Sequence, residues 1–213
     1  MKFKMFIKVC GITDKKQAKQ IEDYGATHIG VIHFEKSPRH ININKIKDIK
    51  ENLQKSKLVA VVVNPTEDLV KKLLDITDII QFHGDESLEF IKKFPKERVI
   101  KAFRIKDENS IEKIKPFVNE NYLILIDAYS EKEYGGTGKQ INQKLVLKVK
   151  NLTDRFILSG GLDEKNVYEL IKKYKPFGVD ASSKLELKPG IKDLNKVKNY
   201  IINAKKAFGE ISE

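Results

Sequence analysis

Two residues that can transfer protons end apolar runs in this chain of 213 residues. Cys10, the only cysteine, ends the first run, and Asp127 follows the aliphatic residues 123–126. A thiolate can serve as a general base where positive neighbours lower its pKa, and Lys8 alternates to the same strand face as Cys10. Desolvation can raise the pKa of a carboxyl group and make it a usable acid. The two residues therefore predict acid–base chemistry.

Both residues also have purely structural interpretations. A lone cysteine is usually a small buried hydrophobe, and Asp127 could simply cap a loop. A nucleophilic cysteine paired with histidine is a further alternative, but no cysteine-protease signature surrounds Cys10. The position of both residues at the ends of predicted strands favours proton transfer.

Phosphate binding is predicted at two turns that follow the last two predicted strands. The first turn contains Gly160 and Gly161, and the second contains Ser182 and Ser183. Glycines let backbone N–H groups approach an anion, and serines add hydroxyl donors. The glycine-rich segment 135–139 departs from the P-loop pattern, so we interpret it as a mobile loop that closes over substrate.

Two further polar side chains are candidates for substrate contacts. Arg39 follows a Ser-Pro pair, and a guanidinium on a stiffened loop suits a bidentate contact with a carboxylate, although a solvated turn arginine is the alternative. His83 could hydrogen-bond substrate, or it could be a satisfied histidine at the edge of the core. The other histidines have no metal-ligand spacing with the cysteine, so we expect no metal site.

The elements that position these residues alternate between strands and helices. Apolar, β-branched runs end near Cys10, Phe34, Asn64, Gly84, Ile105, Asp127, Gly161 and Ser183. Amphipathic segments follow at 15–24, 44–55, 66–76, 87–94, 110–118, 142–151, 163–175 and 193–207. Units of about 25 residues fit a (β/α)8 barrel near its lower size limit, in which chemistry sits at the carboxyl ends of the strands.

The alternative α/β architecture, a doubly wound open sheet, usually has fewer strands and a glycine-rich first turn, which is absent here. No linker or low-complexity stretch divides the chain, so we predict one α/β domain over residues 1–213. In an eight-stranded ring the first and sixth strands face each other across the mouth. We therefore expect Cys10 and Asp127 to act on opposite sides of one small molecule.

Composition narrows the class of protein. No apolar run approaches the roughly 18 residues of a membrane span, and the charged N-terminus does not resemble a secretory signal. A single cysteine forms no internal disulfide and fits a reducing, cytoplasmic compartment. The net charge of +11 is spread over separate helical segments without interleaved aromatic residues, so we expect no nucleic-acid partner. A positive field would still attract a small anionic substrate.

Short segments along nearly the whole chain resemble, in order, the phosphoribosylanthranilate isomerase family of tryptophan biosynthesis. They are 8–13 (KVCGIT), 36–39 (KSPR), 63–64 (VN), 81–86 (QFHGDE), 127–129 (DAY), 135–139 (GGTGK), 159–162 (SGGL), 178–180 (GVD) with 182–183 (SS), and 189–193 (PGIKD). Each segment alone is weak, but their joint order is specific.

The resemblance implies a single (β/α)8 barrel without cofactor or metal, acting as a monomer or homodimer on a small phosphorylated substrate. It implies an Amadori rearrangement that opens the ribose ring of N-(5-phosphoribosyl)anthranilate to give a 1-deoxyribulose 5-phosphate. By resemblance, Cys10 removes the proton from C2 of the sugar, and Asp127 protonates the ring oxygen. Arg39 would hold the anthranilate carboxylate, and Asp180 the ribose hydroxyls.

The resemblance assigns the phosphate to three loops. These contain Gly136 with Gly138, Gly160 with Gly161, and Ser182 with Ser183. The sequence departs from the family pattern at Lys184, where a small residue is expected, and at His33 and Glu35 in a strand expected to be more apolar. Lys184 could clamp the phosphate or lie in solvent.

Two alternative functions come from different classes. One is the sister Amadori isomerase of histidine biosynthesis, or a dual-substrate version, but that barrel resembles a duplicated half-barrel and uses two aspartates. The other is a basic RNA-binding protein without catalytic activity. Salt would abolish nucleic-acid affinity, whereas isomerase activity would depend on Cys10 and Asp127.

Overall fold

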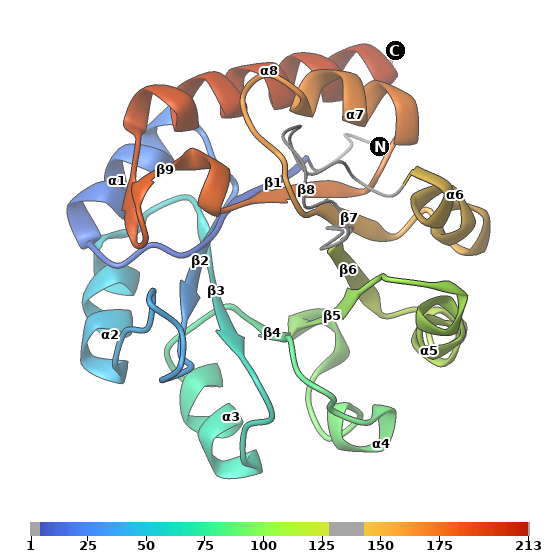
Figure 1. Ribbon diagram of the computed structural model, residues 1–213. Coiled ribbons are helices and arrows are strands. Elements are labelled where there is room, and N and C mark those ends of the chain that lie inside the picture. The colour runs from blue at the N-terminus through green and yellow to red at the C-terminus, as the bar shows by residue number, and fades with distance from the viewer. Residues whose placement is uncertain (1–4, 128–142, 213) are drawn as a thin grey trace.

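The computed structural model describes residues 5–127 and 143–212, and within these ranges eight parallel strands close into a barrel (Figure 1). Each strand pairs with its neighbours in chain order, and β8 pairs with β1. The strands are β1 Phe6–Val9, β2 His28–Ile32, β3 Lys57–Val62, β4 Ile79–Phe82, β5 Val99–Arg104, β6 Leu123–Asp127, β7 Phe156–Ser159 and β8 Gly178–Ala181. The predicted fold class is confirmed.

Helices follow the strands and form a ring outside the barrel (Figure 1). They are α1 Lys15–Tyr24, α2 Ile43–Asn52, α3 Glu67–Leu74, α4 Leu88–Ile91, α5 Glu108–Asn119, α6 Gln143–Leu152, α7 Val167–Tyr174 and α8 Leu194–Ser212. Short 3₁₀ turns occupy η1 Lys96–Arg98 and η2 Ser183–Leu185. Nowhere in the described ranges is a helix both long and apolar enough to cross a membrane.

A short antiparallel pair of strands, absent from the sequence prediction, lies between β8 and α8. Its strands are β9 Glu186–Lys188 and β10 Ile191–Lys192. The turn between them contains Pro189 and Gly190, and the Gly190 backbone adopts a positive φ of 81°. Strands of three and two residues carry no readable alternation of apolar and polar positions, which explains why the pattern did not reveal them.

Many helices begin where the sequence offers a capping side chain. Asp14, Asn42, Thr66, Ser87 and Asp107 each accept a hydrogen bond from a backbone N–H in the first turn of the helix that follows. Such caps satisfy backbone donors that have no partner inside the helix. They fix where each connection enters its helix, and therefore the loops at the barrel mouth.

Side chains pointing into the barrel change from apolar to polar along its axis. An inner apolar cluster fills the end where the strands begin, and it contains Phe6, Val59, Ile79, Ile100, Ala102, Leu125 and Ile157. Residues two positions apart share a strand face, so Lys8 and Cys10 follow Phe6 inward. Polar side chains are thus placed at the ends where the strands finish.

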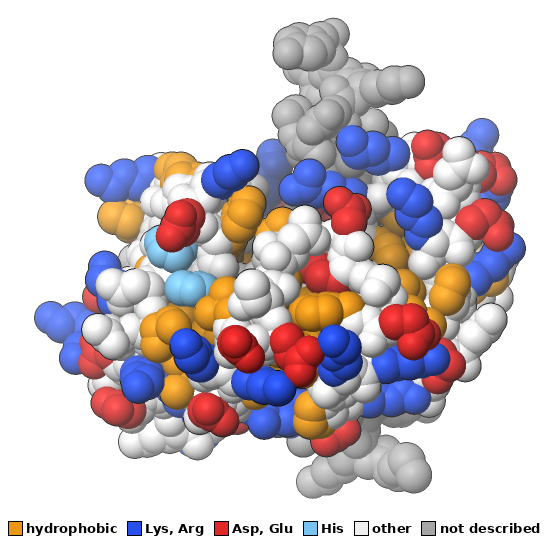
Figure 2. Space-filling view, turned by 90° about the horizontal axis from the view of Figure 1, so that it is seen from below, with side chains coloured by type: hydrophobic (Ala, Val, Ile, Leu, Met, Phe, Trp, Pro, Cys, Tyr) orange, Lys and Arg blue, Asp and Glu red, His pale blue; other side chains and the backbone are white. Residues whose placement is uncertain are grey.

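The surface carries charges of both signs. Figure 2 shows lysine and arginine side chains interspersed with acidic ones over one side of the molecule. Exposed ion pairs also occur, such as Lys15 with Asp48 at 2.9 Å. This distribution agrees with a dispersed positive charge, whose individual exposed pairs contribute little to stability.

Candidate functional site

A buried ion pair lies beside the predicted base. Lys8 and Asp180 are aligned on the adjoining strands β1 and β8, and the Lys8 Nζ is 3.0 Å from Oδ2 of Asp180. The Lys8 side chain is 0% exposed, and Cys10 is also buried. The second carboxylate oxygen of Asp180, Oδ1, is buried and has no hydrogen-bond partner among the described residues. That oxygen is placed to accept a hydrogen bond from a bound molecule.

The pKa of Cys10 reflects two opposing effects. Burial raises the pKa of the thiol, and the positive charge of Lys8 opposes that rise without cancelling it. The prediction that Lys8 places a positive charge beside the thiol is confirmed. Lys8 acts on the pKa of Cys10 in the expected direction, but the overall shift is upward, because desolvation penalises the thiolate more than one paired lysine favours it.

Lys8 keeps its charge in this setting. Burial alone would lower the pKa of Lys8, but the neighbouring Asp180 and Cys10 together raise it above its ordinary value. Burial likewise raises the pKa of Asp180, against the influence of Lys8. Each charge of the pair therefore stabilises the other, because either charge alone would be costly to bury.

Asp127 ends β6 and lines a cavity of about 280 Å³ together with both predicted phosphate turns. The other lining residues include Gly160, Gly161, Ser182, Ser183 and Lys184. Asp180 lines the same cavity, and its electrostatic coupling to Asp127 shows that the two carboxylates are near each other. The structure thus brings the predicted acid and the two predicted anion-binding turns into one space. The exposed Lys184 lies at its edge.

The hydroxyl of Ser182 is already engaged. Its Oγ donates to the backbone carbonyl of Cys10 at 2.9 Å and lies 3.4 Å from Nζ of Lys192. This contact ties the end of β8 to the predicted base. Any contact of Ser182 with an anion is therefore expected to come from its backbone N–H.

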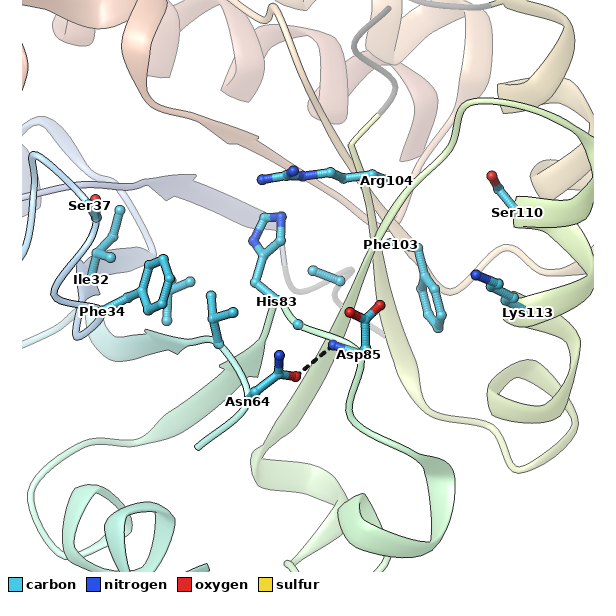
Figure 3. A pocket seen from close by; sticks show the side chains of 14 residues that line it. Ile32, Phe34, Ser37, Asn64, His83, Asp85, Phe103, Arg104, Ser110 and Lys113 are labelled. Atoms are coloured by element: carbon cyan, nitrogen blue, oxygen red, sulfur yellow. Dashed lines mark hydrogen bonds between the residues drawn. The ribbon is translucent and has the colours of Figure 1, made fainter. Parts of the chain in front are cut away.

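A second cavity, of about 630 Å³, opens at the same end of the barrel over β2 to β5 (Figure 3). Ile32, Phe34 and Phe103 give it apolar walls. His83 and the exposed Arg104 extend over it, and no hydrogen bond or ion pair of Arg104 occurs in the part of the chain that the structure describes. Its size and lining suit an aromatic ring that carries an anionic group.

His83 is poised as a neutral hydrogen-bonding group. Burial lowers its pKa to about 4, with further contributions from Arg104 and Lys8, so the imidazole is uncharged near neutral pH. Its Nδ1 lies 3.4 Å from Nε2 of Gln81. Its Nε2 is buried without a partner in the described ranges. A buried polar atom without a partner is costly, so this nitrogen is suited to a ligand.

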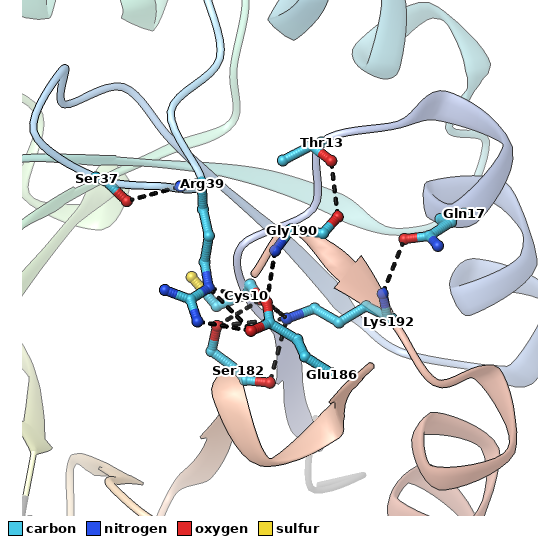
Figure 4. Close-up of polar contacts among 9 residues, drawn as sticks. All are labelled: Cys10, Thr13, Gln17, Ser37, Arg39, Ser182, Glu186, Gly190 and Lys192. Atoms are coloured by element: carbon cyan, nitrogen blue, oxygen red, sulfur yellow. Dashed lines mark hydrogen bonds and ion pairs between the residues drawn. The ribbon is translucent and has the colours of Figure 1, made fainter. Parts of the chain in front are cut away.

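Arg39 makes the bidentate contact predicted for it, but with a carboxylate of the protein (Figure 4). Its Nε is 2.8 Å from Oε1 of Glu186, and its Nη2 is 2.6 Å from Oε2. Glu186 also accepts from Nζ of Lys192 at 2.8 Å. Neither Glu186 nor Lys192 was among the predicted site residues. Lys192 falls in segment 189–193, which resembles the family, but no sequence feature singled out Glu186.

The remaining predicted residues have different outcomes. Gly136 and Gly138 lie outside the described residues. His33 does not line the large cavity, and its Nδ1 lies 2.9 Å from the carbonyl oxygen of Ile41, while Glu35 is exposed. No group of three or more His, Cys, Asp or Glu side chains in the described ranges could hold a metal ion.

Comparisons with known proteins agree with this geometry. Residues 7–203 match the model of the family described as N-(5'-phosphoribosyl)anthranilate (PRA) isomerase. The chain is 56% identical over 197 residues to the N-(5'-phosphoribosyl)anthranilate isomerase of Sulfurihydrogenibium sp., covering 92% of this chain and 97% of that protein.

Solved structures agree with the sequence comparisons. The crystal structure of phosphoribosyl anthranilate isomerase from Thermotoga maritima matches with a TM-score of 0.86 and 32% identity, covering 95% of this chain and 99% of the other. A structure of phosphoribosyl anthranilate isomerase in complex with reduced 1-(o-carboxyphenylamino)-1-deoxyribulose 5-phosphate matches with a TM-score of 0.83 and 30% identity, covering 95% and 99%.

Proposed function

The chain belongs to the N-(5'-phosphoribosyl)anthranilate isomerase family, and from this premise we propose that it catalyses the Amadori rearrangement of N-(5'-phosphoribosyl)anthranilate in tryptophan biosynthesis. The product is 1-(2-carboxyphenylamino)-1-deoxyribulose 5-phosphate. The observation that carries the proposal is one barrel mouth shared by a buried thiol, a carboxyl group and a small cavity lined by glycines and serines.

Asp127 and Cys10 divide the proton transfers between them. Asp127 protonates the ring oxygen of the ribose as the bond from that oxygen to C1 breaks, which leaves an iminium between C1 and the anthranilate nitrogen. The thiolate of Cys10 then removes the proton from C2, giving an enolamine that tautomerises to the ketone. Because the acid ends β6 and the base follows β1, the two groups act from different sides of the mouth.

The two cavities divide the substrate. We assign the phosphate to the smaller cavity at Gly160, Gly161 and the Ser182–Ser183 turn. The larger cavity takes the anthranilate ring, with His83 donating or accepting one hydrogen bond. Asp180 accepts a hydrogen bond from a ribose hydroxyl through Oδ1, which has no partner among the described residues. Arg39 binds the anthranilate carboxylate through the guanidinium edge that Glu186 does not occupy.

The proposal extends to the domain organisation, compartment, oligomeric state and partners of the enzyme. We propose that residues 1–213 form one domain that works in the cytoplasm, as a monomer or homodimer, without a cofactor. Its partner is the small phosphorylated substrate rather than a nucleic acid or a membrane. The direct test follows the fluorescence of freshly generated N-(5'-phosphoribosyl)anthranilate, which the protein should consume far faster than the uncatalysed reaction. A decay unchanged by the protein would contradict the proposal.

Arg39→Ala should weaken carboxylate ligands selectively. Losing a charge-assisted contact costs roughly 1.5–3 kcal/mol, so a product analogue with the ortho-carboxylate should bind about ten-fold to 150-fold less tightly. Inorganic phosphate should bind almost as before, and Arg39→Lys should restore charge but not the planar fork. Calorimetric titration of both ligands checks this. Equal weakening of both would mean that Arg39 acts through the general field or the fold.

The Gly30→Ala variant tests how tightly the side chain of Cys10, the proposed base, is packed. A Cβ at Gly30 in β2 would lie 2.7 Å from Sγ of Cys10 and 2.9 Å from Cε of Lys8, so one of them must move. Overpacking should cost about 1–3 kcal/mol of stability, and a misplaced base should lower kcat by up to ~10²-fold.

Gly209→Ala in α8 is the matched control, because no described atom beyond its neighbours and the adjacent helix backbone lies within 4 Å of the added Cβ. It should raise stability by roughly 0.5–1 kcal/mol and leave kcat alone. Urea denaturation and the fluorescence assay measure both effects. Unchanged kcat in Gly30→Ala would show that the thiol needs no fixed position.

A further inference from the structure

Three charged side chains form a cluster beside the proposed base: Arg39, Glu186 and Lys192. The Glu186 side chain, 4% exposed, receives Arg39 on both carboxylate oxygens and Lys192 on Oε1 (Figure 4). It also accepts the backbone N–H of Gly190 at 3.2 Å. Both oxygens of Glu186 are therefore occupied by contacts within the protein.

The cluster is joined to Cys10 by contacts and by charge. Lys192 Nζ lies 3.2 Å from the carbonyl oxygen of Ser182, whose hydroxyl donates to the carbonyl of Cys10. The charges of Arg39 and Lys192 each interact with the thiol. Arg39 also packs tightly here, because a Cβ at Gly11 would lie 2.7 Å from its Cδ.

The count of charges suits a thiolate. Lys8 and Asp180 cancel each other, whereas the cluster holds two cations and one anion. One positive charge is left over beside Cys10, which a thiolate would balance. A carboxylate of the substrate arriving at Arg39 would compete for the same charge.

We propose that Glu186 is a positioning residue of this isomerase: it fixes Arg39 for the substrate carboxylate and restrains Lys192, so that the cluster presents a single positive charge to Cys10. The inference rests on the proposed function. It follows that binding of the substrate carboxylate neutralises the surplus positive charge beside Cys10. The thiolate is then a stronger base when the proton on C2 must be removed. Substrate binding and base strength are thereby coupled.

Several other groups face Cys10 or its partners and set the background for its titration. They are Lys8 on β1, Asp180 on β8, Asp127 at the end of β6 and the neutral His83 after β4. Replacing Glu186 leaves all four of these side chains in place. A shift in the titration of Cys10 on replacing Glu186 therefore reports the cluster.

The test uses the single cysteine of the chain as its own probe, through the ultraviolet absorbance of the thiolate as pH rises, with Cys10→Ala as the blank. Glu186→Gln removes one negative charge and should move the titration midpoint to lower pH. It should also raise KM for the substrate roughly ten-fold, because Arg39 loses its anchor. Glu89→Gln, whose carboxylate is 84% exposed on α4, is the matched control and should change neither quantity.

Two further variants separate charge from packing. Glu186→Asp keeps the charge but shortens the side chain, so the midpoint should return to the wild-type value while KM stays high. Lys192→Met removes a cation and should move the midpoint to higher pH, and it keeps the test informative if Glu186→Gln does not fold.

The outcomes separate the two proposals. An active wild type with an unchanged midpoint and KM in Glu186→Gln would overturn the positioning role alone, as would a midpoint that moves to higher pH. Absence of isomerase activity in the wild type would overturn the proposed function and this inference with it.

Discussion

Cys10→Ala and Asp127→Asn are each expected to lower kcat by at least ~10²-fold, the usual contribution of a general base or acid. Neither side chain is assigned to holding an anion, so inorganic phosphate should bind both variants almost as it binds the wild type. The fluorescence assay gives kcat, and calorimetry gives the phosphate affinity. Cys10→Ser is a sharper companion, because it keeps the shape of the side chain but replaces the thiol by a group that hardly ionises.

The loss of turnover in the two variants can be distinguished from general damage to the fold. Cys10 is buried, so Cys10→Ala leaves a small void whose effect on stability urea denaturation will report separately. A variant that keeps near-wild-type turnover would remove its residue from the mechanism. A large loss of phosphate affinity alongside kcat would mean that the mouth itself is distorted.

The sequence predicted those parts of the fold that depend on local patterns. Strand ends such as Cys10 and Asp127 could be located because apolar runs stop there, and parallel strands in a barrel bring their carboxyl ends to one mouth. Strand boundaries shifted by one or two residues, as at Ser159 against the predicted Gly161, which is ordinary for element ends. Despite these shifts, the polar residues lie at the strand ends, as predicted.

What the sequence could not predict depends on long-range contacts and on burial. Arg39 and Glu186 lie 147 positions apart, and nothing local indicates that they form an ion pair. The direction of the Cys10 pKa shift needed the depth of the thiol as well as its neighbours, because burial and Lys8 act in opposite senses. The sequence therefore predicted an acid, a base and the nearby charge of Lys8, but neither the effect of burial nor the charges of Glu186 and Lys192.

Breaking the buried pair at Lys8 should destabilise the barrel strongly. Lys8→Met keeps most of the volume but leaves Asp180 without its cation, and removing one partner of a buried pair costs about 3–5 kcal/mol. Lys15→Met is the matched control, because the pair of Lys15 with Asp48 is exposed on both sides and should contribute less than about 1 kcal/mol. Urea denaturation at neutral pH measures both.

The pH dependence and a double variant identify the cause of that loss. In Lys8→Met the pKa of Asp180 should sit still further above its unfolded value, so the variant is most stable when Asp180 is protonated and loses stability as pH rises. Its deficit against the wild type should therefore shrink on acidification. Combining Lys8→Met with Asp180→Asn removes both charges, and the total cost should fall short of the sum of the single variants by roughly 2–3 kcal/mol. Additive costs, or a deficit independent of pH, would mean that Lys8 stabilises the barrel by packing rather than by its charge.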